Sequence, residues 1–212
     1  MVAAAVLVGG ASRRMGRDKA TMPVGGVELA ALVLRVAARV ADPVVLVAPG
    51  GHPARELAAG PLASRRRPSG RAAARWVADP GLGPLAALAA ALAALDAEHV
   101  LVLAGDHPGL RVELLAHLIG RRGQGEAVAC RRGPRLEPLV AVYRRAPALA
   151  GARARLAAPA AGWSLLGLLA ALRTVVVEED EWRALDPDGR SFVDLDDPAD
   201  LAAWDSGLEP PR

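Results

Sequence analysis

Lysine, cysteine, asparagine and aromatic residues are scarce or absent in this chain. It has one cysteine, Cys130, so an intrachain disulfide and a Cys-x-x-Cys metal or redox motif are both excluded. It has four Trp, one Tyr and one Phe, too few for the stacking surfaces that bind single-stranded nucleic acid, and its arginines are spread along the chain. The net charge of +3 therefore favours small anionic substrates, and we expect no nucleic-acid partner.

Long hydrophobic runs and a secretory signal are also missing. Although 52% of the residues are hydrophobic, no uninterrupted apolar stretch is long enough to span a membrane. The start of the chain lacks a basic segment followed by a cleavable apolar core. We therefore expect a cytoplasmic protein with no membrane partner.

The pattern of apolar segments predicts an α/β protein. At 212 residues the chain fits one domain, residues 1–212. Strand-like runs alternate with helix-like segments, which predicts a three-layer Rossmann-like sandwich with a mainly parallel sheet. The expected strands are Met1–Val8, Pro43–Ala48, Ala74–Val77, His99–Ala104, Glu126–Ala129, Leu139–Tyr143 and Thr174–Glu178. The expected helices are Glu28–Val40, Pro84–Leu95, Arg111–Arg121, Gly151–Ala158, Ser164–Leu172 and Pro198–Trp204.

The only lysine, Lys19, ends a glycine-containing basic run that begins at Leu7. A chain that uses arginine at its other 25 cationic positions needs a compact, movable ammonium at this one, because a planar guanidinium cannot fill the same space. Gly9 and Gly10 lack a Cβ, so their N–H groups can approach a ligand closely. Such amides form an anion-binding concavity, and Arg14 and Lys19 add mobile positive charge. The run therefore predicts a polyphosphate site.

Two familiar phosphate loops do not fit this run. A Walker A loop needs Gly-Lys-Ser/Thr, whereas Gly16 is followed by Arg-Asp-Lys-Ala, with no hydroxyl for magnesium. The Gly-x-Gly-x-x-Gly dinucleotide spacing is absent as well.

An acidic residue, Asp106, stands at the end of the expected strand His99–Ala104. Ligands gather at the carboxyl ends of parallel strands, and an aspartate there can hold a hard cation against a triphosphate. The alternative is a turn residue that caps the helix beginning near Arg111.

The run from Leu7 to Lys19 resembles the signature loop of the molybdenum cofactor guanylyltransferases, Leu-x-Gly-Gly-x-Ser-x-Arg-Met-Gly-x-Asp-Lys. The departures are minor, notably Val8 where alanine is usual. The resemblance implies that the sheet contains an antiparallel strand, for which we expect Leu139–Tyr143. It implies that Arg14, Lys19 and Asp106 are catalytic and that Asp106 binds Mg²⁺. The nucleotide-binding residues that it implies are Leu7, Val8, Gly9, Gly10, Ser12, Lys19, Asp79, Gly83, Pro84, Leu85 and Asp106.

The same resemblance covers two further segments. The turn Gly83-Pro84-Leu85 matches the family's guanine-binding turn, although it also reads as a well-made helix start. Asp194 and Asp196 match the family's closing Asn-x-Asn or Asp-x-Asp pattern, which makes Asp194 a candidate second metal ligand. Asp197 before Pro198 reads as a helix N-cap. The basic segment 61–75 reads as a solvated loop and is not assigned a role.

The activity that the resemblance implies is transfer of GMP from GTP to the terminal phosphate of molybdopterin, with release of pyrophosphate and a requirement for Mg²⁺. Molybdoenzyme-maturation proteins are expected as further partners. No serine or cysteine is placed for a nucleophile elbow, so covalent catalysis has no candidate. Two alternatives stay open: a cytidylyltransferase or other small-phosphate nucleotidyltransferase, and a non-catalytic carrier of molybdopterin or nucleotide.

Overall fold

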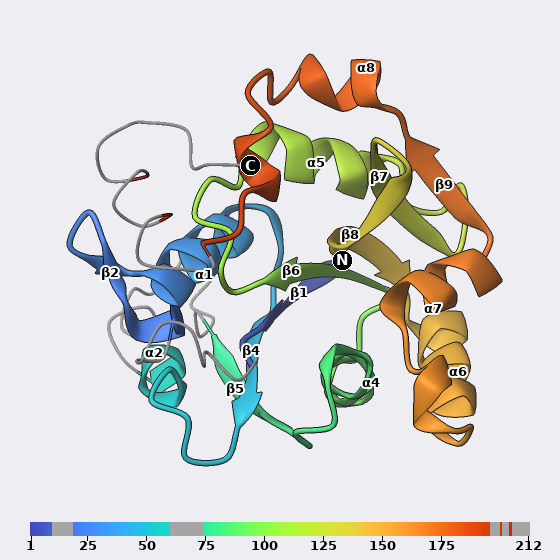
Figure 1. Ribbon diagram of the computed structural model, residues 1–212, viewed down its shortest axis with the longest axis horizontal. Helices are drawn as coiled ribbons and strands as arrows, with labels where there is room; N and C mark the ends of the chain where they lie inside the picture. The colour runs from blue at the N-terminus through green and yellow to red at the C-terminus, as the bar shows by residue number, and fades with distance from the viewer. Residues whose placement is uncertain (10–18, 60–73, 196–199, 201–203, 205–212) are drawn as a thin grey trace.

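The computed structural model describes residues 1–9, 19–59, 74–195, 200 and 204 (Figure 1). Its main feature is a seven-stranded sheet in the order β5-β4-β1-β6-β8-β7-β9. These strands are β1 (Val2–Leu7), β4 (Val44–Pro49), β5 (Arg75–Asp79), β6 (His99–Ala104), β7 (Ala127–Arg132), β8 (Arg135–Arg144) and β9 (Thr174–Val177).

The sheet is parallel except around β8. Strands β1, β4, β5 and β6 are mutually parallel, as are β7 and β9, whereas β8 is antiparallel to both β6 and β7. The expected antiparallel strand, Leu139–Tyr143, forms part of β8, so that prediction is confirmed.

Helices cover both faces of the sheet, which confirms the three-layer α/β sandwich (Figure 1). The apolar sides of three helices pack on one face: α1 (Leu29–Val40), α2 (Arg55–Ala59) and α5 (Val112–Gly120). Three others pack on the opposite face: α4 (Pro84–Ala94), α6 (Arg145–Leu156) and α7 (Leu165–Ala171). The short helices α8 (Glu179–Arg183) and η3 (Arg190–Phe192) contribute Trp182 and Phe192 to the α5 side of the core.

Small side chains at the centre of the sheet bring these layers close together. All six residues of β1 are buried, and Ala3, Ala4 and Ala5 have no exposed surface. A strand buried on both faces reads as a continuous apolar run, which is why β1 was predictable from its sequence.

Some elements begin elsewhere than expected or were not expected. Helix α6 begins at Arg145, six residues before the predicted start at Gly151, because Pro147 lies in its first turn, where proline is tolerated. The expected helix Pro198–Trp204 lies outside the described residues except for Asp200 and Trp204. The sequence did not predict β2 (Pro23–Val24), β3 (Val27–Glu28), η1 (Lys19–Thr21), α2, η2 (Ala160–Gly162), α8 or η3. Within the described residues, no helix is both long and apolar enough to cross a membrane.

Candidate nucleotidyl-transfer site

Backbone hydrogen bonds extend the central strands past their formal ends and bring the predicted site residues to one edge of the sheet. The Val8 N–H donates to the carbonyl of Val47 at 2.8 Å, and the Gly105 N–H donates to the carbonyl of Leu7 at 2.9 Å. Gly9 and Asp106 therefore follow neighbouring strands at their carboxyl ends, where parallel sheets bind ligands.

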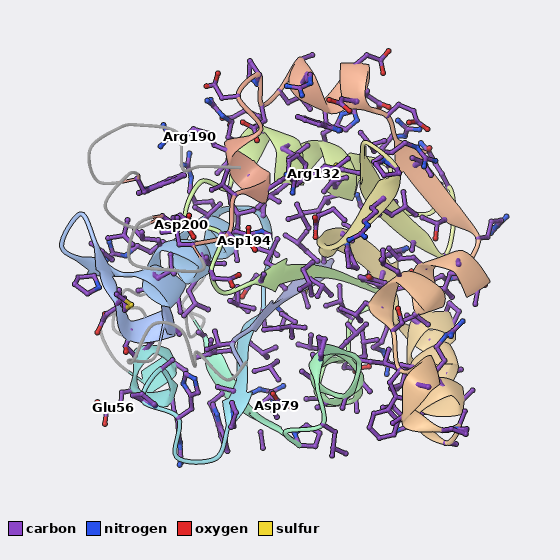
Figure 2. The ribbon with its side chains drawn as sticks, in the orientation of Figure 1. Glu56, Asp79, Arg132, Arg190, Asp194 and Asp200 are labelled. Atoms are coloured by element: carbon purple, nitrogen blue, oxygen red, sulfur yellow. The ribbon has the colours of Figure 1, made fainter. Side chains whose placement is uncertain are left out.

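Gly9 lies directly against the carboxylate of Asp79. A Cβ at position 9 would lie 2.9 Å from Asp79 Oδ2 and 3.6 Å from Pro49 Cδ. Asp79 Oδ1 accepts a hydrogen bond from the Gly81 N–H at 2.9 Å, which fixes the carboxylate (Figure 2). The structure thus brings together two predicted nucleotide-binding residues, one that follows β1 and one that ends β5, although β4 separates the two strands.

The turn before α4 is built as the sequence indicated. Gly83 precedes the helix with a φ of 94°, which favours glycine, and Pro84 occupies the first turn. Gly83 and Pro84 are exposed, but the Leu85 side chain is 1% exposed and belongs to the core. Any ligand contact at position 85 would therefore come from the backbone.

Two further predicted residues, Leu7 and Val8, also point into the core. Val8 has a structural role besides, because a Cβ on Gly105 would lie 2.4 Å from Val8 Cγ2. The larger residue at position 8 thus requires glycine at position 105.

Asp106 does not cap the helix that follows it. The residue preceding α5 is Arg111, and no side chain caps that helix by a hydrogen bond. The Arg111 N–H instead donates to Ser191 Oγ at 2.9 Å. The Asp106 side chain is 32% exposed, and its Oδ1 lies 3.9 Å from Nε2 of the buried His107. Asp106 therefore lies in a turn after β6 without capping α5, and its role as a metal ligand stays a prediction.

Asp194 is brought to Asp106 by a backbone hydrogen bond. The Leu195 N–H donates to the Asp106 carbonyl at 3.3 Å, and Leu195 is fully buried while Asp194 is exposed (Figure 2). The two candidate metal ligands thus lie on adjacent chain segments, although they are far apart in the sequence.

A buried carboxylate that the sequence did not single out, Asp186, holds the Asp194 segment in place. Its Oδ1 accepts from Arg111 Nε at 2.9 Å and from the Arg190 N–H at 3.2 Å, and its Oδ2 accepts from the Ser191 N–H at 2.7 Å. The Asp186 side chain has no exposed surface. This cluster ties the chain before Asp194 to the chain after Asp106.

Several predicted residues lie outside what the structure describes. They are Gly10, Ser12, Arg14, the side chain of Lys19, Asp196, Asp197 and most of the segment 61–75. Their assigned roles stay predictions.

The carboxylates of Asp106 and Asp194 suit magnesium better than a metal bound wholly by protein. Among the described residues, no group of three or more His, Cys, Asp or Glu side chains could hold an ion. Mg²⁺ commonly takes one or two carboxylates, completing its shell with water and substrate phosphates. Asp106 and Asp194 fit that pattern.

Comparison with known proteins identifies the family of this chain. Residues 4–175 match the model of the MobA-like NTP transferase domain. The chain belongs to that family. It is a nucleotidyltransferase, and its strand-end edge with Gly9, Asp79 and Asp106 is its candidate active site.

Relatives in this family cover most of the chain. A "probable molybdenum cofactor guanylyltransferase" of Synechococcus elongatus is 36% identical over 159 residues, which are 70% of this chain and 73% of the relative. A protein of the same name from Chloroflexus aggregans is 32% identical over 209 residues, or 95% and 92%.

Solved structures agree on the fold. Molybdopterin-guanine dinucleotide biosynthesis protein A from Archaeoglobus fulgidus is 26% identical, with a TM-score of 0.74 over 96% of this chain and 97% of that one. The 4-diphosphocytidyl-2C-methyl-D-erythritol synthase from Anaerococcus prevotii has a TM-score of 0.73 over 97% and 95%, but at 16% identity it supports the fold alone.

Proposed function

We propose that this nucleotidyltransferase transfers GMP from GTP to the terminal phosphate of molybdopterin. The relatives named as molybdenum cofactor guanylyltransferases support this choice of substrates. The main structural support for GTP as the donor is the close approach of Gly9 to the Asp79 carboxylate, beside the exposed Gly83 turn. A carboxylate that accepts two N–H groups suits the amino and ring N–H edge of guanine, which cytosine and adenine lack.

The reaction needs alignment more than acid–base chemistry. An oxygen of the molybdopterin phosphate attacks the α-phosphorus of GTP, and the bond from that phosphorus to the oxygen bridging to the β-phosphate breaks, so pyrophosphate leaves. A phosphate monoester has a second pKa of about 6, so its oxygen is already nucleophilic at neutral pH. Holding the two phosphates in line is then the main task of the protein.

Each site residue has a role in this alignment. The amides at Gly9 and Gly10 hold the triphosphate, while Arg14 and Lys19 balance the charge on the α-phosphate and the departing pyrophosphate. Asp106 and Asp194 would hold Mg²⁺, which when bound neutralises phosphate charge and orients the phosphates. No nucleophilic side chain takes part.

Pyrophosphate release tests the proposal against its alternatives. With GTP, Mg²⁺ and molybdopterin, we expect pyrophosphate and a guanine dinucleotide in equal amounts, and neither when the acceptor is omitted. Asp106→Asn should fold normally and lose about 10²–10³ in turnover, because one charge-stabilising contact is removed. Binding of both substrates without pyrophosphate release would identify a carrier instead.

A further inference from the structure

Strand β8 contains a large bulge at the edge of the candidate active site. Its pairing with β7 jumps from Ala129 opposite Ala141 to Arg131 opposite Leu136. Four residues of β8, 137–140, therefore lie opposite the single residue Cys130 of β7. At this point β8 has three more residues than β7. Bulges of this kind re-aim side chains and are common beside active sites.

The bulge lies where β6 ends. The last pair between β6 and β8 is Leu103 with Val140. Because the strands are antiparallel, the part of β8 from Val140 back to Glu137 continues past the end of β6. Gly105 and Asp106 leave β6 at that same end. Glu137 thus belongs to the same edge as the candidate metal ligands.

A buried tyrosine fixes the shape of the bulge. The Tyr143 hydroxyl donates a hydrogen bond to the Pro138 carbonyl at 2.9 Å, and Tyr143 has no exposed surface. Burial, followed by the charge of Glu137, raises the pKa of Tyr143, so the hydroxyl keeps its proton and stays a donor. The position of Glu137 is therefore set by the core.

The Glu137 carboxylate has acceptor capacity to spare. Its side chain is only 20% exposed, and Arg132 Nη1 lies 3.8 Å away, beyond hydrogen-bond distance. That guanidinium donates instead to the Phe192 carbonyl at 3.0 Å, two residues before Asp194 (Figure 2). Among the described residues no group donates a hydrogen bond to Glu137, although a carboxylate can accept up to about four.

We propose that Glu137 binds the pterin ring of the acceptor, an inference that rests on the proposed function. A pterin presents a 2-amino group and an adjacent ring N–H as two parallel donors, which match the two oxygens of a carboxylate as a guanidinium does. Glu137 accepts both, with the acceptor phosphate directed from the bulge toward Asp106.

Guanine has the same pair of N–H donors as a pterin, so hydrogen bonding alone does not decide which ring binds Glu137. The order of the strands assigns one ring to each carboxylate. Asp79 is the last residue of β5, and Glu137 belongs to β8, on the other side of β1 and β6. Strand β1, which leads into Gly9, lies between them in the sheet. One carboxylate on each side of the reacting phosphates gives each ring its own acceptor: Asp79 for guanine and Glu137 for pterin.

Steady-state kinetics of Glu137→Gln test this assignment. We expect the KM for molybdopterin to rise about 10- to 100-fold, the effect of losing hydrogen bonds to a charged group, while the KM for GTP stays within a factor of two. Glu178→Gln is the matched control, because its 54% exposed carboxylate pairs with the neighbouring Arg131 at 2.9 Å. An unchanged KM for molybdopterin, or a raised KM for GTP in its place, overturns the assignment.

Binding of a free pterin separates this inference from the proposed function. Fluorescence titration with 6-hydroxymethylpterin, without nucleotide, should show binding to the wild type and to Glu178→Gln and about tenfold weaker binding to Glu137→Gln. Equal binding by all three proteins, or none by the wild type, overturns the pterin site. If the wild type makes no guanine dinucleotide but binds pterin through Glu137, the proposed function fails and the pterin site stands.

Discussion

Gly9 leaves no room for a side chain beside Asp79, because a Cβ at position 9 would lie 2.9 Å from Asp79 Oδ2. Gly9 carries no φ in the left-handed region, so its backbone conformation is open to any residue, and the constraint at this position is space alone. Because Asp79 is held by the Gly81 N–H, its carboxylate cannot retreat without losing that hydrogen bond.

We therefore expect Gly9→Ala to lower kcat/KM for GTP by about 10- to 100-fold, because a methyl group 2.9 Å from Asp79 Oδ2 displaces the carboxylate or the loop. The melting temperature should change little. Gly120→Ala is the control, since a Cβ there meets nothing within 4 Å. Kinetics of Gly9→Ala equal to those of the control would contradict the close packing that we assign to this site.

The site residues that could be predicted from the sequence stood out because they are rare or belong to a motif. Lys19 is the only lysine, and Asp106 ends an apolar run. Asp186 and Glu137 gave no such signal, because their roles arise from contacts that chain order does not show. Asp186 bonds to Arg111, and Glu137 is placed by a bulge that only the pairing of β7 and β8 reveals. For Glu137, the one available signal was its position just before the apolar strand Leu139–Tyr143.

At the scale of elements, two chain segments meet through the Asp186 cluster. Asp186 joins Arg111, at the start of α5, to Arg190 and Ser191 of η3. Only a few residues separate Asp106 from Arg111, and Asp194 from Ser191. Anchoring Arg111 and Ser191 therefore also restricts the positions of Asp106 and Asp194. Asp186 would thus position the two candidate metal ligands without touching substrate.

Asp186→Asn should lower the free energy of unfolding by about 2–3 kcal/mol, because an amide nitrogen would face the Ser191 N–H or the Arg111 guanidinium in a buried site. The variant should also need more Mg²⁺ for half-maximal turnover, which a purely structural role would not require. Asp188→Asn is the control, since its 62% exposed side chain lies 3.5 Å from Arg111 and should contribute less than about 0.5 kcal/mol. Urea unfolding and Mg²⁺ titration measure both effects. An unchanged Mg²⁺ requirement would remove the positioning role.

Buried strands and long helices were predictable, whereas the two-residue strands and the helices of five residues or fewer were not. Buried strands such as β1 and β6 have six apolar or nearly apolar residues each, and α4 begins at a Gly-Pro pair with known helix-start chemistry. The hairpin of β2 and β3 has two residues per strand, and α2 has five residues in all. Such lengths give no measurable periodicity, so tertiary packing decides their structure.

At the scale of the whole molecule, stability depends on a sheet buried on both faces, and one histidine lies inside it. His99 begins β6, is 8% exposed, and its buried Nε2 has no hydrogen-bond partner among the described residues. Burial lowers the pKa of His99 below its usual 6.5, with Glu98 opposing the shift and Arg122 and Arg144 adding to it.

A lowered pKa in the folded state means that the unfolded chain binds the proton first as the pH falls. The stability associated with neutral His99 is therefore complete above about pH 6.5 and is lost as the pH falls toward the folded pKa. We expect urea unfolding from pH 8 to pH 5 to show this loss in the wild type and a smaller one in His99→Leu. Parallel profiles for the two proteins would show that His99 is not the group responsible.

We propose that the two ends of this site select guanine and pterin around one phosphate-transfer centre. The most direct test compares GTP, CTP and ATP as donors to molybdopterin at fixed Mg²⁺, with pyrophosphate release as the readout. We expect kcat/KM for GTP to exceed that for CTP and for ATP by at least about 100-fold, because the polar groups of Asp79 and the Gly83 turn go unpaired with the wrong base. Equal or better use of CTP would contradict the guanylyl assignment.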